Sequence, residues 1–231
     1  SRRIFRQRRD RFRQLARGTA LGATSPEGHP APSRPVRFLG KGPNAIVRPG
    51  AVLVAPSHEA SNLLMKSAVF VQAVGEDDEG TTLVRGVVID HPTAFTMGEM
   101  APGTVYGSLA GNILFRGGDT GSDTAMLLHS RGGDAVECGD MIGASGIYEG
   151  GLQSALDAAE EGVVDSEEFK FFFNFVEFTE RELEQMLEEV DSAGDAWMSV
   201  EVPKEMVLDG DFNRAEAWKY IRNQVTQMGI E

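Results

Sequence analysis

Cysteine, histidine and long apolar runs are all scarce in this sequence of 231 residues. Its single cysteine, Cys138, excludes an internal disulfide and any metal site built from several cysteines. The four histidines lie at positions 29, 58, 91 and 129, without the short spacings typical of zinc ligands. No apolar run reaches the roughly 20 residues of a membrane-spanning helix, and the longest, residues 169–176, is interrupted by Lys170 and Asn174. We therefore expect no transmembrane segment, no metal ion and no cofactor.

Basic residues are few in most of the chain but concentrated at its start. Residues 1–20 contain eight arginines and one acid, a net charge of +7, and the other 14 basic and 34 acidic side chains give the rest of the chain −20. An acidic body of this kind repels nucleic acid and anionic membranes, so nucleic acid is not an expected partner of the body. Residues 1–17 predict a basic amphipathic helix whose arginines surround an apolar face made of Ile4, Phe5, Phe12 and Leu15.

This N-terminal segment has two interpretations. It is a docking helix for an acidic partner, an anionic lipid surface or RNA, with contacts made by Arg2, Arg3, Arg6, Arg9 and Arg13. Alternatively it is leftover targeting sequence, because Arg-rich, acid-poor amphipathic segments are similar to organelle transit peptides. Residues 18–35 are rich in Gly, Pro, Ala and Ser and predict a linker, so the folded domain is expected over residues 36–231.

Strand patterns come first along this domain and helical patterns later, which indicates an α+β fold. Apolar runs bounded by turn residues predict strands at 51–55, 67–74, 81–90, 112–116, 125–129, 145–148, 169–178 and 196–202. Helical spacing predicts helices at 148–161, 179–190 and 213–228, a short helix or turn at 62–67, and one helical turn at 96–100. Thr179 followed three residues later by Glu182 is a capping-box arrangement, which places a helix start there.

Three segments combine glycine, proline and aromatic residues in a distinctive way. Residues 86–93 are GVVIDHPT, followed by FTMGEM at 95–100; residues 114–129 are LFRGGDTGSDTAMLLH; and residues 174–184 are NFVEFTERELE. Together they resemble the AlgH-like (YqgE-type, DUF179) family over roughly residues 49–225. That family has a Gly-Leu-Val-Ile-Asn-Arg-Pro-Thr strand, a Gly-Gly-Pro segment before a strand ending in Leu-His, and a glycine-rich aromatic turn before a helix.

The resemblance implies a bifurcated, mostly antiparallel β-sheet curled into a pseudo-barrel with flanking helices. It also marks a candidate family-motif surface, which in this sequence consists of Asp90, His91, Pro92, Thr93, Gly117, Gly118, Asp119 and His129. The chain departs from the family at several of these places. Asp90 and His91 stand where the family has Asn-Arg, Asp119 stands where it has proline, and Asn174, Glu177 and Thr179 replace glycines of the aromatic turn. The family's biochemical role is poorly defined, and plants and algae carry plastid members.

Local motifs for catalysis are incomplete in this chain. Residues 119–122, DTGS, match the tetrapeptide of aspartic proteases, but the single copy and the preceding Gly117 and Gly118 indicate a turn. These two glycines are followed by a strand pattern and by no Gly-Lys-Ser/Thr, which argues against a phosphate-binding loop. No catalytic residue is therefore predicted.

The sequence favours a non-catalytic binding or assembly protein of an organelle, such as a peripheral subunit or assembly factor of a larger, photosynthetic complex. Protein partners would contact the arginine-rich helix, the acidic stretch 157–201, or both. The expected location is the chloroplast, in the stroma or peripheral to the thylakoid membrane, with the mitochondrion as the alternative. Two other functions stay open: a regulator of transcription acting through the basic tail, and a small-molecule-binding enzyme with a site near Asp90, His91, Asp119 and His129.

Overall fold

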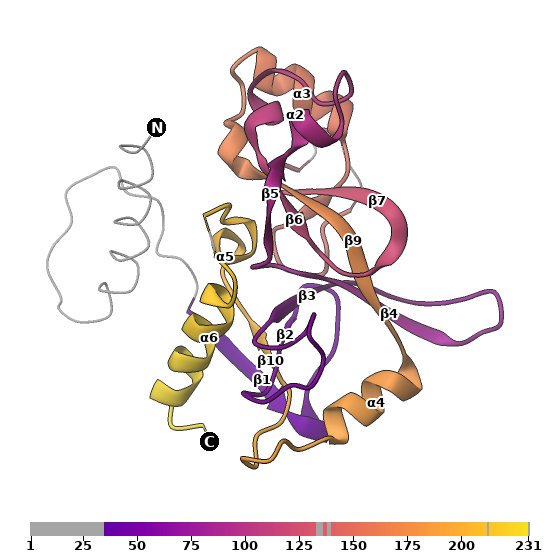
Figure 1. The fold of residues 1–231 in the computed structure, drawn as a ribbon, viewed down its shortest axis with the longest axis vertical. Helices are drawn as coiled ribbons and strands as arrows, with labels where there is room; N and C mark the ends of the chain where they lie inside the picture. The colour runs from indigo at the N-terminus through magenta and orange to yellow at the C-terminus, as the bar shows by residue number, and fades with distance from the viewer. Residues whose placement is uncertain (1–34, 133–135, 138–139, 212, 231) are drawn as a thin grey trace, which may run out of the picture. The chain divides into compact units, whose positions relative to one another are not determined.

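The computed structural model describes residues 35–132, 136–137, 140–211 and 213–230, drawn in colour in Figure 1. The chain divides into two units, residues 1–33 and residues 34–231, and all described residues belong to the second. The basic helix predicted over residues 1–17, with its five docking arginines, lies outside the described residues. So does the predicted linker, except for Pro35.

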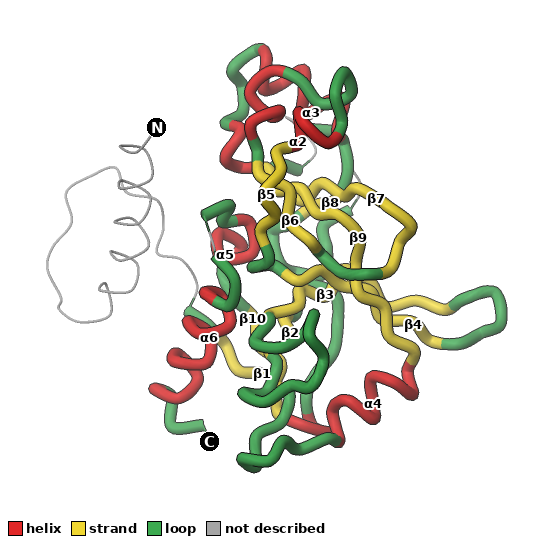
Figure 2. Tube along the Cα trace, in the orientation of Figure 1, coloured by secondary structure: helices red, strands yellow, loops and turns green. Residues whose placement is uncertain are grey.

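The described residues contain strands and helices in mixed order (Figures 1 and 2). The strands are β1 (Arg37–Lys41), β2 (Val52–Val54), β3 (Ala68–Glu76), β4 (Thr82–Val88), β5 (Pro92–Thr96), β6 (Ile113–Arg116), β7 (Thr120–His129), β8 (Tyr148–Glu149), β9 (Phe169–Thr179) and β10 (Met198–Glu201). The helices are α2 (Met97–Met100), α3 (Leu152–Glu160), α4 (Glu180–Glu188), α5 (Lys204–Leu208) and α6 (Glu216–Gln227), with 3-10 turns η1 (Gly42–Asn44), η2 (Gly107–Gly111) and η3 (Ser166–Glu168). Strands β1 and β5 and helix α5 were not predicted from the sequence.

Two predicted boundaries around residue 148 are wrong. The strand predicted at 145–148 is only the two-residue β8, because Gly146 has a φ of 76° and the Ser145 side chain bonds the backbone of Ile142 and Ile147 in a turn. The helix predicted from residue 148 begins at Leu152, since residues 150 and 151 are glycines with φ of 92° and 71°. Positive φ is accessible to glycine at little cost and cannot continue a helix.

Strand β9 belongs to both halves of the sheet. Residues 171–173 pair in parallel with β6 and in antiparallel with β7, whereas residues 176–179 pair with β4. Between the two stretches Asn174 has a φ of 58°, in the left-handed region that asparagine adopts more readily than most residues. The sheet therefore forks at Asn174, and Figure 1 shows β9 running from β6 and β7 toward β4 and α4.

The strand order is β1-β10-β2-β3-β4-β9-β6-β5, with β7 pairing β9 and β8 off this path. All described pairs are antiparallel except β6 with β9. The predicted α+β fold with a bifurcated, mostly antiparallel sheet is confirmed. The sheet is open, since its end strands β1 and β5 do not pair with each other in the described part of the chain.

Each half of the fork has its own hydrophobic core. One core gathers side chains of β6, β7, β9, η2 and α3, including Leu109, Leu127, Leu156 and Phe171. The other gathers side chains of β2, β3, β4, the last stretch of β9 and α4, together with Trp197 just before β10; its members include Leu53, Val71 and Leu187. Burying each large apolar side chain stabilises the fold by roughly 1.5–3 kcal/mol, so the two cores hold the halves of the fork in place.

Helix α4 begins where the sequence predicted. The Thr179 hydroxyl accepts a hydrogen bond from the Glu182 backbone N–H at 3.3 Å, and the Glu182 carboxylate accepts one from the Thr179 backbone N–H at 2.8 Å. This reciprocal pair is a capping box, and it satisfies N–H groups that a helix start leaves without partners. Leu183 and Leu187, one turn apart, face the core, while Glu182 and Met186 share a neighbouring face.

None of the helices in the described residues has the length and apolar character needed to cross a bilayer.

Candidate functional site

The double glycine of the RGGD segment sits at the fork of the sheet. Gly117 accepts a hydrogen bond from the Val88 N–H and donates one to the Phe173 carbonyl, each 2.8 Å, so its backbone links β4 to β9. A Cβ at Gly118 would lie 1.9 Å from the carbonyl atoms of Phe175, and one at Gly117 would lie 2.4 Å from the Asn174 oxygen. No side chain fits there. The two glycines are thus required by the close approach of the β6–β7 connection to β9, and no helix start follows them to bind phosphate.

Asp90 follows β4 and is fully buried. Its Oδ2 accepts a hydrogen bond of 3.3 Å from the backbone N–H of Trp218 in the first turn of α6. The residue at the N-cap position of this helix, Ala215, has no side-chain group that could do so. Asp90 therefore caps α6 from a distant segment. Desolvation raises the pKa of Asp90 to about 6, although this backbone bond and the charges of Lys170 and Arg214 act in the opposite direction.

Lys170, the second residue of β9, is buried beside Asp90. Its ammonium donates hydrogen bonds to the carbonyls of Ile89 at 2.7 Å, Val207 at 3.0 Å and Asp209 at 2.7 Å, and lies 4.0 Å from the centre of the Phe115 ring. The three carbonyls come from the residue that follows β4, from α5 and from the loop after α5. Burial lowers the pKa of Lys170 to about 7, opposed by the carboxylates of Asp209 and Asp90. One lysine thus ties three separate segments together.

Arg214 continues this buried polar cluster toward the surface. Its guanidinium donates to the His91 Nδ1 and, at 3.0 Å each, to the carbonyls of Asn62 and Leu63. His91 must be a neutral acceptor in this contact. Consistently, desolvation and then the charges of Arg214 and Arg116 lower its pKa to about 4. We refer to Asp90, His91, Lys170 and Arg214 as the buried polar cluster, although only Asp90 and Lys170 are fully buried and His91 and Arg214 are partly exposed.

The remaining motif residues hold strands together. The Thr93 hydroxyl donates to the Leu114 carbonyl at 2.7 Å, and Pro92 begins the edge strand β5, where its missing N–H costs no ladder hydrogen bond. His129 is fully buried at the end of β7. Its Nδ1 accepts from the Arg131 N–H at 3.2 Å and its Nε2 lies 3.2 Å from the Gly150 carbonyl, so the neutral imidazole bridges two loops, and desolvation lowers its pKa.

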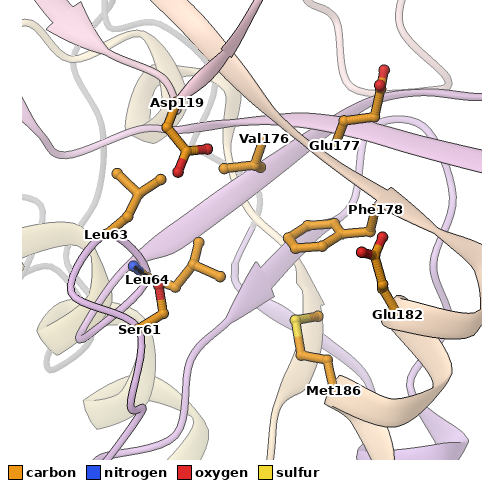
Figure 3. Close-up of a pocket in the computed structure, with 9 residues that line it drawn as sticks. All are labelled: Ser61, Leu63, Leu64, Asp119, Val176, Glu177, Phe178, Glu182 and Met186. Carbon is orange, nitrogen blue, oxygen red and sulfur yellow. Dashed lines mark hydrogen bonds between the residues drawn. The ribbon is translucent and has the colours of Figure 1, made fainter.

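Asp119 lies elsewhere, in a groove of about 350 Å³ (Figure 3). The groove is lined by Ser61, Leu63, Leu64, Asp119, Val176, Glu177, Phe178, Glu182 and Met186. Figure 3 shows the Phe178 ring and the leucine side chains facing one another, with Asp119 beside Leu63 and Val176. The apolar floor is continuous with the core around Trp197, against which Leu63, Leu64, Phe178 and Met186 pack.

The structure therefore divides the predicted motif surface. Asp90 and His91 join the buried polar cluster, Gly117 and Gly118 pack against β9, His129 lies between the ends of β7 and β8, and Asp119 alone of these lines the groove. The enzyme hypothesis needs Asp90, His91, Asp119 and His129 in one pocket, whereas the groove contains only Asp119. Across the described residues no three His, Cys, Asp or Glu side chains are grouped as ligands for a metal ion.

Lys170 and Arg214 were not recognised as site residues from the sequence. A signal for Lys170 was present, because a lone lysine inside the aromatic run FKFFFNF must find acceptors if that run is a buried strand. No such signal existed for Arg214, whose carbonyl acceptors lie about 150 positions away in the chain.

The chain is thus an α+β protein with an open, mostly antiparallel sheet that forks where two glycines allow close contact between strands. The chain belongs to the AlgH-like family (DUF179), whose model matches residues 53–230. None of the curated proteins compared with the chain matches it.

Two solved structures share the fold. A crystal structure of a protein from Corynebacterium diphtheriae is 19% identical with a TM-score of 0.56, and the match covers 76% of this chain and 86% of that one. The solution structure of the AlgH protein from Pseudomonas aeruginosa is 16% identical with a TM-score of 0.53, covering 79% of this chain and 89% of that one. At these identities the similarity shows the fold alone.

Proposed function

We propose that this AlgH-like protein is a non-catalytic binding or assembly protein of an organelle, acting as a peripheral subunit or assembly factor of a larger complex. The observation that supports the proposal is that most of the family-motif residues make structural contacts within the fold. Asp90 caps a helix, Gly117 and Gly118 allow two chain segments to touch, and His129 bridges two loops. Groups engaged in this way support a scaffold, and the groove beside Asp119 is left available to a partner.

The charge distribution supports the same proposal. Residues 1–20 carry +7 and the rest of the chain −20, so one protein combines a basic segment with an acidic remainder that would attract different partners. Opposite charges on partners steer association and select among competitors. The basic segment, similar in composition to a transit peptide, favours the chloroplast, with the mitochondrion as the alternative.

The test is the size of the native complex that contains the full chain in extracts of its source organism. The unaltered chain should migrate with a larger assembly, and a full-length variant with serine at Arg2, Arg3, Arg6, Arg9 and Arg13 should shift toward the free chain. A control variant with serine at Arg181 and Lys219, both exposed on helices of the folded domain, keeps the tail intact and should migrate like the unaltered chain. If the unaltered chain migrated only as a free protein, the proposal of a complex subunit would be wrong.

A further inference from the structure

The groove beside Asp119 combines an apolar floor with acidic residues and has no lysine or arginine in its lining. Leu63, Leu64, Val176, Phe178 and Met186 form the apolar part. They come from the turn that precedes β3, from the last stretch of β9 and from α4, and contacts outside the groove hold two of these segments in place. Arg214 donates hydrogen bonds to carbonyls of the turn, and the capping box fixes the start of α4. The groove is therefore preformed.

The carboxylates of the groove differ in how far the fold uses them. Glu177 forms an ion pair with Arg85 at 3.1 Å, and Glu182 serves the capping box, where hydrogen bonds from Thr179 lower its pKa. Asp119 is exposed and makes no hydrogen bond or ion pair with any residue that the structure describes. Its carboxylate is thus the group of the lining that is free to bind a cation from outside.

We propose that this groove is the docking site for a basic amphipathic segment of a partner protein. An apolar side chain of the segment packs on Phe178, Leu64 and Met186, and a neighbouring arginine or lysine pairs with Asp119. The proposal rests on the proposed function, since it names the chemistry of the partner and the surface that it contacts.

The shape and charge of the groove select this occupant. Its volume of about 350 Å³ is at the small end of the range for ligand pockets, roughly 300–1,000 Å³, so it admits a few side chains better than a whole cofactor. Carboxylates repel phosphate, which argues against nucleotides, nucleic acid and anionic lipid. Acids on neighbouring surface extend the negative field, because Glu180, Glu184 and Glu188 are exposed on α4.

The test is a titration of the full chain with a fluorescent peptide of defined chemistry. The probe has the sequence SRRIFRQRRDRFRQLAR, and a control peptide has serine in place of its Ile, Leu and two Phe residues. The unaltered chain should bind the probe more tightly than the control peptide. Since a partly exposed ion pair changes a dissociation constant by up to about fivefold, Asp119→Asn should weaken binding by about three- to fivefold and Asp119→Lys by tenfold or more.

Matched variants separate the groove from general charge. Glu184→Gln removes an acid from the outer surface of α4. Because salt screens the interaction of this exposed charge with the peptide, the affinity should change by less than about 1.5-fold. Met186→Gln leaves the net charge unchanged and keeps a good helix former in α4, but it removes an apolar side chain from the floor of the groove. This variant should bind the probe more weakly and the control peptide with unchanged affinity. Equal loss in Asp119→Asn and Glu184→Gln would overturn the proposal, as would equal binding of the two peptides.

Two further outcomes identify a different answer. If the full-length variant with five tail arginines changed to serine bound the probe much more tightly than the unaltered chain, the occupant would be the protein's own tail and the partner assignment would be wrong. If native complexes persisted unchanged in Asp119→Lys, groove docking would fail while the proposed function stood. If the unaltered chain formed no native complex but still bound the peptide, the proposed function would fail while groove docking stood.

Discussion

Replacing Lys170 by methionine removes the ammonium that joins the end of β4 to α5 and the loop after it. Three carbonyls, those of Ile89, Val207 and Asp209, lose their donor, and the buried Asp90 carboxylate loses a neighbouring positive charge. A buried carbonyl without a donor costs about 1–3 kcal/mol, but removing the ammonium also removes its own desolvation penalty. Breaking one partner of a buried charged arrangement costs about 3–5 kcal/mol, which is the loss expected here.

The measurement is urea unfolding of the full chain at pH 7, followed by calorimetry. A loss of this size should lower the melting temperature of a domain this large by roughly 10 °C. Lys219→Met is the matched control, because Lys219 is exposed on α6, and it should change stability by less than about 0.5 kcal/mol.

A double variant tests the reasoning more sharply. With Lys170 already replaced, Asp90→Asn removes the uncompensated charge but keeps an oxygen to accept from the Trp218 N–H. We expect the double variant to be more stable than Lys170→Met alone, by about 1–2 kcal/mol. A loss below about 1 kcal/mol for Lys170→Met, or simple additivity in the double variant, would refute the view that Lys170 and Asp90 stabilise each other.

The remaining predictions concern the pH dependence of stability and the fork of the sheet. The pKa of Asp90 is raised to about 6 in the folded state, so the folded state binds this proton more tightly than the unfolded state does, and the free energy of unfolding rises as the pH falls through 6. Between pH 7 and pH 5 the unaltered chain should gain about 1.3 kcal/mol in urea unfolding relative to Asp90→Asn. A loss relative to that variant would contradict the sign of this shift. Gly118→Ala forces a Cβ onto the Phe175 carbonyl and should cost at least about 2 kcal/mol or abolish soluble expression, whereas Gly75→Ala, whose Cβ meets open space, should be close to neutral. Because Asn174 has a positive φ, Asn174→Gly should be about 1 kcal/mol more stable than Asn174→Ala, and the reverse order in chemical denaturation would contradict a left-handed junction.

Local features of the fold could be predicted from the sequence because their causes are local. The two strands of the β3–β4 hairpin were predicted from apolar runs at 67–74 and 81–90, and the start of α4 follows from Thr179 and Glu182. A strand was predicted at 169–178 from its aromatic run, and β9, which pairs with β4, β6 and β7, confirms it.

Other features depend on contacts that no local pattern records. The pattern of β9 does not say that it changes partners at Asn174, because that change is set by where β4 and β7 lie. In the same way, the sequence marks Asp90 as a motif residue but cannot show that it caps α6, whose first turn lies 128 residues away. The groove is assembled from segments around residues 61, 119, 177 and 186, so its lining could not be predicted.

Asp90 and Asp119, two of the acidic departures from the family pattern, have different consequences because their burial differs. Asp90, where the family has asparagine, is fully buried, and an asparagine oxygen could accept the same bond from Trp218; the aspartate adds a charge that the fold must compensate with Lys170. Asp119, where the family has proline, is exposed and faces the groove, so its charge is available to another molecule. A proline there would leave the apolar floor unchanged and remove the cation-binding group. It follows that relatives with this proline should bind basic amphipathic segments more weakly, and Asp119→Pro in this chain would reproduce that difference in the peptide titration.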